Sequence, residues 1–416
     1  MIIAVVLFIC VSVATILGLT NPMVRHIAMA TSASISKESF YAAEAGIEDV
    51  IYRLKSGLPV ASSQILMVGN HSVVTTVADE LGGKVITAIG DANDYFRKVE
   101  THLALGTGAS FFYGIQSDVG GIVIENSASV EGNAYSNGSI VSSVNGRING
   151  DIVSAGPGGL LDGVRTTGNA YSHTIQGSYV EKDAFYQTIT GSTVLGSSYP
   201  GSTDQPTSSL PISDEMIEEW KAVAVLGGNI IPQSCPYKIT SSTTLGPTKI
   251  ECDLEIDGTN FTVTIAGPVW VNGNMSFKNS PTIRVSSLLQ NKSVPIIADN
   301  PSNPAGSAKI IIENSTRFEG AGDNSYVLVI SQNNSVENGG SEVAINVKNS
   351  VEGDLLVYAK HGEIMVQNSI DLKEISGYRL RLKNYAMVIY DTGLASLLFS
   401  AGPSGGFEIS SWKEVE

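Results

Sequence analysis

The amino-acid sequence predicts a mainly β protein, in which a right-handed parallel β-solenoid head is carried on a long N-terminal α-helix. Three observations lead to this prediction. The chain begins with an uncharged, mostly apolar stretch over positions 1–19. A helical spacing of apolar residues continues from there to position 54. Beyond position 110, short β-branched runs recur at a regular spacing, and such self-similarity indicates stacked structural repeats.

The composition narrows the range of functions. The chain has 416 residues, of which only 16% are charged, against a usual share of about 25%. Its net charge of −15 argues against binding nucleic acid, because phosphate contacts depend on basic side chains. Three cysteines are too few for a disulfide scaffold, and five scattered histidines form no metal-ligand motif. We therefore expect an extracellular structural protein without enzymatic activity, cofactor or metal.

The N-terminal helix is predicted to begin in a membrane and to leave it. Residues 1–19 carry no charge, and about 20 helical residues span a hydrocarbon core of about 30 Å. A helical stripe resumes after Pro22 and Arg25, and Gly57 with Pro59 ends the helix. A simpler interpretation of the same pattern is a single-pass anchor with a juxtamembrane helix.

A short block within this helix carries a family resemblance. The residues from Phe40 to Glu48 read FYAAEAGIE and follow an uninterrupted apolar N-terminus. In these features residues 1–57 resemble the type IV pilin family, specifically pilins with a PilX-like N-terminal segment. The resemblance implies that prepilin peptidase exposes Met1 as the mature first residue, which is then methylated. It also implies a helix in the core of a filament, with the notable positions Val5, Gly18, Pro22, Phe40 and Glu44.

The same resemblance implies partners and a location. It predicts polymerisation with other copies of the chain and with other pilins, and contact with the type IV pilus assembly machinery. The subunit is expected in the inner membrane before assembly and in an extracellular filament at the cell surface afterwards. Many filament-forming pilins share a proline at the position of Pro22, whereas most major pilins have glutamate in place of Val5. The sequence therefore leaves open whether this is a bulk, minor or tip subunit.

The chain divides into five predicted segments. Residues 1–57 form the assembly helix, and residues 58–110 form a small β meander that packs on it. Residues 111–196 form a first solenoid segment. Residues 197–230 are rich in proline, serine and glycine at their start, which predicts an exposed linker followed by a short helix. Residues 231–416 form a second solenoid segment.

Two series of corners carry the repeat. Gly-Asn or Gly-Asp pairs follow one another at equal intervals, at positions 132, 150 and 168. Asn-Ser pairs recur at positions 279, 314, 349 and 368. Glycine and asparagine tolerate the left-handed backbone of tight corners, and stacked asparagines can form hydrogen-bonded ladders. The alternative is a β-sandwich with ordinary loops, a fold that does not require motif self-similarity.

Cys235 and Cys252 form a candidate disulfide. Their separation along the chain is close to one repeat, so they are expected at adjacent levels of the stack. An oxidising exterior favours the bond, and the alternative is a loop thiol at Cys235 with an ordinary buried Cys252. Acidic residues alternate with apolar ones from Glu251 to Asp257. This row predicts a solvated face or, if loop oxygens contribute, a calcium site.

Tyrosines of the first solenoid segment are candidates for ligand contact. On neighbouring repeats they would form a platform for surface or host-cell glycans or for proteins, although corner packing gives the same spacing. The candidates are Tyr135, Tyr171, Tyr179 and Tyr186, with Tyr199 just beyond this segment. We predict a type IV pilus subunit whose head attaches to cells or surfaces. The alternatives are a minor or tip pilin adhesin, a membrane-anchored adhesin that does not polymerise, and a β-helix carbohydrate-active enzyme.

Overall fold

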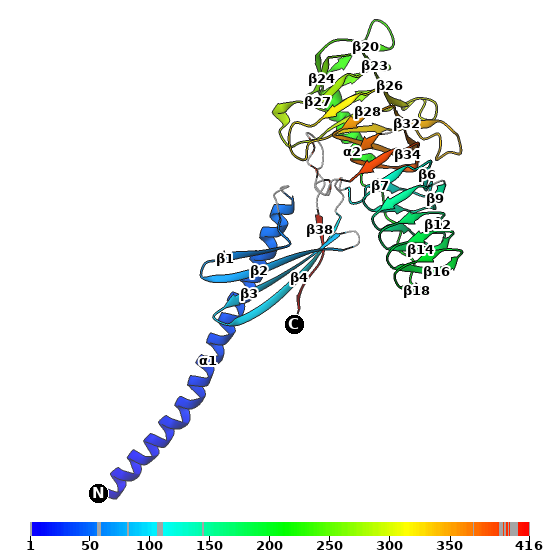
Figure 1. Ribbon diagram of the computed structural model, residues 1–416. Coiled ribbons are helices and arrows are strands. Elements are labelled where there is room, and N and C mark those ends of the chain that lie inside the picture. Colours follow the sequence, from blue (N-terminus) through cyan, green and yellow to red (C-terminus); the bar gives the residue numbers. More distant parts are fainter. Residues whose placement is uncertain are drawn as a thin grey trace. The chain divides into compact units, whose positions relative to one another are not determined.

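The computed structural model describes residues 2–55, 60–80, 83–105, 111–143, 145–368, 370–390, 394, 397, 399 and 407–415 (Figure 1). The chain forms two compact units. The first consists of Met1–Leu105 with Phe407–Glu416, and the second is Gly106–Gly406. Each unit has its own sheet system, and the chain passes from the first into the second and returns to the first.

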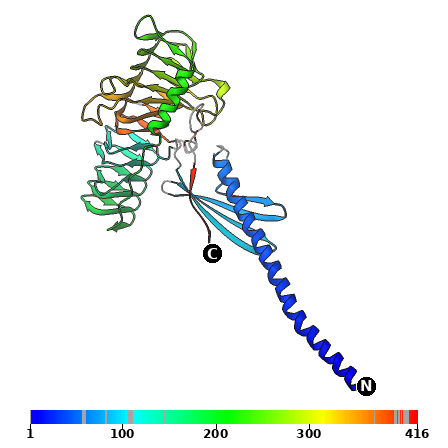
Figure 2. The same ribbon diagram turned by 180° about the vertical axis from the view of Figure 1, so that it is seen from behind.

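The first unit combines one long helix with an antiparallel sheet. The helix α1 runs for 54 residues, from Ile2 to Lys55. The sheet has the strand order β1-β2-β3-β4-β38, and Figure 2 shows the second half of α1 lying along it. The strands are β1 (Ser63–Val68), β2 (His71–Glu80), β3 (Gly83–Ala92), β4 (Tyr95–Leu105) and β38 (Phe407–Val415).

Small residues allow α1 to approach this sheet closely. Ala42, Ala43 and Gly46 are buried on the helix. A Cβ atom on Gly46 would lie 2.5 Å from a methyl carbon of Val73, and one on Gly90 would lie 2.1 Å from the backbone oxygen of Ser39. The Ser39 hydroxyl also donates a hydrogen bond of 2.7 Å to the carbonyl oxygen of Gly90. The block of small residues near position 43 is therefore explained by packing within the chain.

The second unit consists of short parallel strands stacked in two half-stacks. The first half-stack contains β5 (Ile115–Ser117), β6 (Ile122–Glu125), β7 (Ser129–Glu131), β8 (Ala134–Ser136), β9 (Ile140–Ser143), β10 (Arg147–Asn149), β11 (Ile152–Ser154), β12 (Leu160–Asp162), β13 (Arg165–Thr166), β14 (Ala170–Gln176), β15 (Tyr179–Val180), β16 (Ala184–Thr190), β17 (Thr193–Val194) and β18 (Ser198–Pro200). Their inward residues, mostly Ile, Val, Leu and Ala, share one continuous core with those of the second half-stack.

The second half-stack lies between residues 229 and 389. It contains β19 (Asn229–Ile230), β20 (Tyr237–Ile239), β21 (Thr243–Leu245), β22 (Thr248–Ile250), β23 (Leu254–Asp257), β24 (Thr262–Ile265), β25 (Val269–Val271), β26 (Met275–Lys278), β27 (Thr282–Val285), η1 (Ser287–Leu289), β28 (Val294–Ala298), β29 (Ile310–Glu313), β30 (Arg317–Glu319), β31 (Val327–Ser331), β32 (Val343–Lys348), β33 (Glu352–Gly353), β34 (Leu355–Gln367), β35 (Asp371–Leu372), β36 (Glu374–Lys383) and β37 (Met387–Ile389). The helix α2 (Asp214–Leu226) precedes it and packs on β22, β25 and β28.

The two half-stacks meet at a joint between the first and last strands of the unit. The strand β36 pairs in parallel with β5 and β6, and β37 pairs with β7. Strands from the start and the end of the unit are therefore neighbours. From β18 at the far end of the first half-stack, the chain returns along residues 201–213, which we call the strap, to reach α2 and the second half-stack.

The predicted fold class, a right-handed parallel β-solenoid on a pilin-type helix, needs correction. The protein is mainly β, but its described strands form four sheets, one of them antiparallel. A simple solenoid adds each repeat onto the preceding one, whereas here β5 stacks on β36 from near the other end of the unit. The second parallel segment also does not continue to residue 416, because β38 pairs with β4. A repeat period determines the spacing of strands along the chain but not which strands become neighbours.

An asparagine ladder runs through the second half-stack and across the joint. The amide nitrogens of Asn314, Asn349, Asn368 and Asn384 each donate to the side-chain oxygen of the preceding asparagine, beginning at Asn279, with distances of 3.0 to 3.4 Å. Asn126 of the first half-stack continues the ladder by donating to Asn384 at 2.9 Å. These asparagines have positive φ angles, between 53° and 72°. The predicted corner chemistry is thus present, and it connects both half-stacks.

Replacing Asn349 with alanine should lower the free energy of unfolding by about 2–3 kcal/mol, because two side-chain hydrogen bonds are lost and alanine must adopt the φ of 64° that asparagine tolerates. Asn349→Gly removes the same bonds without backbone strain, so it should cost only about 1–2 kcal/mol. Urea unfolding of both variants measures the difference, and equal losses would show that the backbone conformation contributes nothing.

Candidate assembly interface

The N-terminal half of α1 is an exposed apolar surface. In residues 2–13, the large aliphatic and aromatic side chains have between 48% and 83% of their surface accessible. They are Ile2, Ile3, Val5, Val6, Leu7, Phe8, Ile9, Val11 and Val13. Successive helical residues are about 100° apart, so these side chains point in all directions around the helix. We call residues 2–13 the apolar segment.

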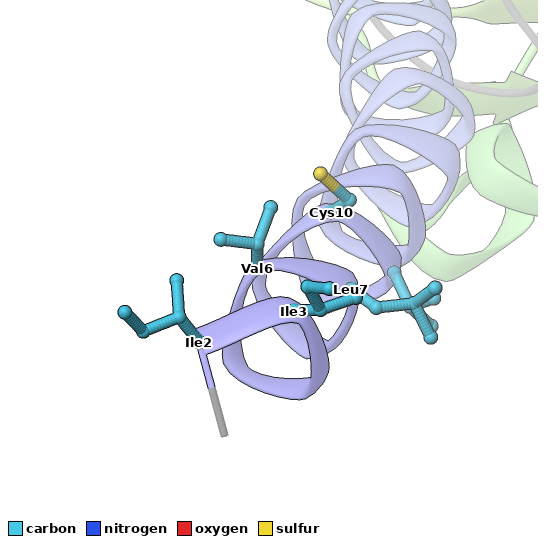
Figure 3. A pocket seen from close by; sticks show the side chains of 6 residues that line it. Ile2, Ile3, Val6, Leu7 and Cys10 are labelled. Carbon is cyan, nitrogen blue, oxygen red and sulfur yellow. The ribbon is translucent and has the colours of Figure 1, made fainter.

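One face of the apolar segment is shown at close range in Figure 3. Ile2, Val6 and Cys10 project along one side of the helix, with Ile3 and Leu7 beside them. Almost the whole of this surface is carbon, and Cys10 is a free cysteine. In the described part of the chain, no helix has both the length and the apolarity needed to cross a membrane. The prediction of a membrane-spanning N-terminal helix is therefore not supported by the described residues.

The structure describes the predicted N-terminal positions to different extents. Val5 lies in the apolar segment and is 53% exposed. Gly18 and Pro22 lie within α1, which continues through position 22 without a break, but their side chains are outside the described part of the structure. Met1, the predicted processing and methylation position, lies outside the described residues. Of these positions, only Val5 is placed by the structure as an accessible side chain.

Phe40 and Glu44 lie in the half of α1 that packs on its own sheet, and both are partly buried. Burial raises the pKa of the Glu44 carboxyl, and the neighbouring negative charge of Glu48 adds to this effect. The structure therefore divides the predicted helix residues into two sets. Those at the N-terminal end are apolar and exposed, and those in the second half pack against the sheet of the same unit. The sequence indicated this division in part, because residues 1–19 carry no charge, whereas charged residues accompany the apolar stripe in the second half of the helix.

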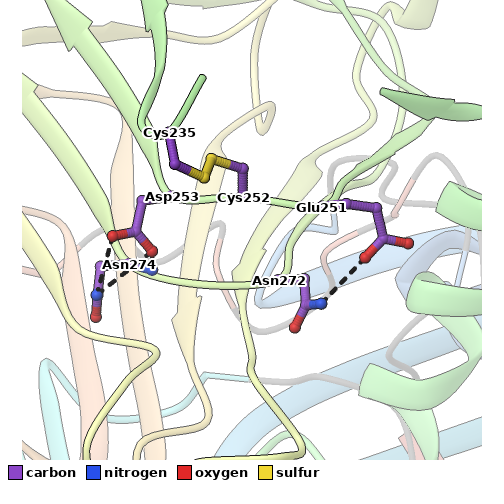
Figure 4. The surroundings of a disulfide bond; sticks show 6 residues. All are labelled: Cys235, Glu251, Cys252, Asp253, Asn272 and Asn274. Carbon is purple, nitrogen blue, oxygen red and sulfur yellow. Dashed lines mark hydrogen bonds between the residues drawn. A yellow bond between two sulfur atoms is a disulfide. The ribbon is translucent and has the colours of Figure 1, made fainter. Parts of the chain in front are cut away.

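The structure joins Cys235 and Cys252 in a disulfide, with a Cα–Cα distance of 5.8 Å (Figure 4). Carboxylates flank Cys252 on both sides. Asp253 accepts hydrogen bonds from the backbone and side chain of Asn274, and Glu251 accepts one from Asn272. Lys249, 2.7 Å from Glu251, and Asn272 lower the pKa of that carboxyl. Both carboxylates are thus hydrogen-bonded or paired with side chains of the same chain. In the described residues, no group of three His, Cys, Asp or Glu residues is arranged to hold a metal ion.

Two of the predicted tyrosines are not accessible. Tyr186 points into the core, and Tyr135 is covered by the strap, where its hydroxyl donates to the carbonyl oxygen of Pro206. Burial raises the pKa of Tyr135 to about 12. Tyr179 lies under the guanidinium group of Arg165, with the carbon at its centre 4.9 Å from the ring centroid.

Tyr171 and Tyr199 belong to a column of three stacked rings, whose middle member, Phe185, the sequence analysis did not identify. The ring centroid of Tyr171 lies 4.7 Å from that of Phe185, which lies 4.6 Å from that of Tyr199, and the ring planes of both pairs are nearly parallel. The three residues are evenly spaced along the chain, more closely than the Gly-Asn corners, and Tyr171 and Phe185 each follow an inward-facing alanine. This shortened period and the Ala-aromatic pairs are the sequence signal that was missed.

The helix α2 is held on the second half-stack by a buried ion pair. Lys221 lies 2.6 Å from Asp299 and 2.6 Å from Glu218, and both Lys221 and Asp299 are buried. Burial alone would lower the pKa of Lys221, but the two carboxylates raise it above its ordinary value overall. Beside this pair, Trp220 is fully buried and packs against Phe399. These contacts fix the return path of the chain over the stack.

Comparisons with known proteins give little further information. No protein-family model matches the chain, and no curated protein matches it significantly. A solved structure, the competence-associated pilin ComZ from Thermus thermophilus, is similar over 91% of this chain and 97% of its own. The sequence identity is 12% and the TM-score is 0.34. A TM-score this low does not establish a shared fold, so none of the conclusions below depends on it.

Proposed function

We propose that the protein is a pilus-type structural subunit whose copies associate through the apolar segment of α1. The observation that carries this proposal is the difference between the two halves of the helix. One face of the second half is covered by its own sheet, whereas residues 2–13 expose apolar side chains in every direction. A helix that is apolar on all sides requires cover on all sides. A single partner helix covers one stripe, so the proposal calls for several surrounding copies, as in a filament.

The energetic basis of the proposed assembly is burial of apolar surface. Full burial of one Leu, Ile, Phe or Val side chain is worth about 1.5–3 kcal/mol. Nine such side chains lie in the apolar segment, so contact among several copies would offset a substantial loss of translational and rotational freedom. The disulfide between Cys235 and Cys252 supports an oxidising, extracellular location for the assembled subunit.

The unit of residues 106–406 is proposed to form the displayed surface of the subunit. It would contact cells, surface glycans or other surfaces without a catalytic step. The accessible part of the column formed by Tyr171, Phe185 and Tyr199 is the candidate contact point. Processing at Met1 by prepilin peptidase, contact with the pilus machinery and the presence of other pilins in the filament stay predictions from the sequence.

The test is a charge in the apolar segment. Full-length wild-type protein is kept soluble in mild detergent, the detergent is removed, and assembly is followed by sedimentation velocity and electron microscopy. Wild type should form filaments or large oligomers. Leu7→Glu should assemble at least a hundredfold less readily, because a buried leucine contact is replaced by a carboxylate that would have to be desolvated.

Tyr52→Glu is the matched control, because Tyr52 is similarly exposed but lies on the half of α1 that is packed on the sheet. It should assemble like wild type. Undiminished assembly of Leu7→Glu would reject the proposed interface. Flotation of wild type with lipid vesicles, with no protein–protein cross-links along residues 2–13, would instead support attachment to a membrane.

A further inference from the structure

A carboxyl group is buried without a charge partner at the joint between the half-stacks. Glu374 is the first residue of β36 and has no accessible surface. The hydroxyl group of Ser376 donates to its Oε1 atom. Its Oε2 atom has no hydrogen-bond partner in the described structure. An ionised carboxylate in such a position would lack nearly all the stabilisation that water provides, so the closed joint requires the neutral acid.

Glu374 lies directly at the joint, so its ionisation would affect the strand pairs that close it. Glu374 is the register partner of Leu356 on β34, and the next residue, Ile375, is the partner of Ile115 on β5. Leu356 belongs to an apolar cluster beneath α2 and the strap, together with Ile212, Met216 and Trp220. Glu374 therefore lies where the last strands of one half-stack, the first strand of the other and their common cover come together.

The ionisable groups around Glu374 provide no positive charge that would stabilise its ionised form. Tyr358 on β34 donates its hydroxyl to the carbonyl oxygen of Ile212 in the strap, and its pKa is raised mainly by burial, with the charges of Asp214 and Asp118 adding to this effect. Asp214 at the start of α2 is paired with Lys360 and His361. Asp118 follows β5, and Tyr390 beyond β37 donates to the carbonyl oxygen of Phe111. In the described structure no basic side chain forms an ion pair with Glu374.

We propose that the joint is a proton-dependent latch, which stays closed while Glu374 is protonated and opens when this carboxyl ionises. Opening would separate β36 from β5 and β6, and β37 from β7, and would give Glu374 access to water. Each half-stack would keep its internal strand pairs, because Glu374 lies on β36, the strand of the second half-stack that pairs across the joint with β5 and β6. Alkaline conditions would thus divide the unit at one defined place.

The direction of the pH effect follows from the protonation of the two states. Burial raises the pKa of Glu374 well above its ordinary value of 4.5, and the bond from Ser376 only partly opposes this. The closed joint therefore binds a proton that the open joint releases. The stabilising contribution is complete below about pH 4.5 and declines as pH rises towards the pKa of the closed state. Within this interval, the equilibrium constant for opening should rise about tenfold per pH unit.

Hydrogen exchange on the full-length protein between pH 5 and 9 tests the latch. Three backbone amides report on the joint, those of Ile375, Leu380 and Ser129, because each donates across it. The amides of Ile152 and Met275, which donate within single half-stacks, report on the rest of the unit. After correction for intrinsic exchange, protection of the joint amides in wild type should fall with pH by up to tenfold per unit, and protection of the other two should not.

Glu374→Gln is the main variant, since it keeps the shape of the side chain but cannot ionise. Its joint amides should show no such fall with pH. Glu374→Leu extends the apolar row of Leu356 and provides the same test if the glutamine variant does not fold. His361→Gln is the control for loss of the ion pair between His361 and Asp214, and it should keep the wild-type slope at the joint. An equal slope in wild type and Glu374→Gln, or loss of protection throughout the unit at once, would overturn the proposal.

Discussion

Replacing Trp220 with alanine should lower the free energy of unfolding of the 106–406 unit by about 3–5 kcal/mol. Trp220 is the largest fully buried side chain of the described protein. It lies between α2 and the second half-stack, with its ring 4.8 Å from that of Phe399. Alanine at this position leaves a cavity at the place where α2, the strap and the outer face of the sheet meet. The surrounding strands cannot close it, because their own pairing holds them in place.

The measurement is denaturant unfolding followed by circular dichroism, which does not depend on the deleted indole. Leu226→Ala is the control on the same helix, because Leu226 is 86% exposed and its truncation should cost less than about 0.5 kcal/mol. Hydrogen exchange should show that the loss in Trp220→Ala begins in α2 and the strap. A loss no larger than that of Leu226→Ala would mean that the apolar cluster beneath α2 contributes little to stability.

Replacing Gly90 with alanine should destabilise the first unit by about 3 kcal/mol. The added methyl carbon would lie 2.1 Å from the backbone oxygen of Ser39 and 2.8 Å from the backbone nitrogen of Ala43. Both atoms belong to the backbone of α1, so no side-chain rotation relieves the overlap. The helix must move away from β3, which also breaks the hydrogen bond from Ser39 to Gly90.

Hydrogen exchange of α1 residues 39–54 and of β3 measures this effect, and both should lose protection in Gly90→Ala. Ile89→Ala is the control, because Ile89 neighbours Gly90 on β3 and is exposed on the other face of the sheet. This control should leave exchange in α1 close to wild type. If the two variants were equally protected, the close contact between helix and sheet would not be an important source of stability.

The residues that form the corners of the stack could be predicted from the sequence. The spacing of Asn-Ser pairs indicated stacked corners, and the structure contains the ladder from Asn279 to Asn384. Corner residues are constrained by the backbone conformation of their own turn, so a single sequence records them. The pairing of Cys235 with Cys252 was available from the same spacing, because residues one repeat apart lie on adjacent levels.

The order of the strands was not predictable in the same way. Which strands meet at the joint depends on β36 and β5, which lie near opposite ends of the second unit and have no distinctive matching motif. The sequence analysis also did not predict which side chains face the core, because a shift of one residue in the strand reverses inward and outward positions. Tyr186 faces the core because the inward position of β16 begins at Ala184, which places Phe185 outside. The burial of Tyr135 depends on the strap, a segment without a repeat.

The continuity of the small antiparallel sheet has a consequence for how such a chain can change over time. Leu105, the last residue of β4, is paired with Phe407, the first residue of β38. Residues 106–406 therefore leave and re-enter the first unit at a single hairpin position. The hairpin requires only that the two ends of the inserted unit return to each other, whatever lies between them. An insertion of different size or sequence whose ends return to this position would therefore leave the pairing of β4 with β38 unchanged.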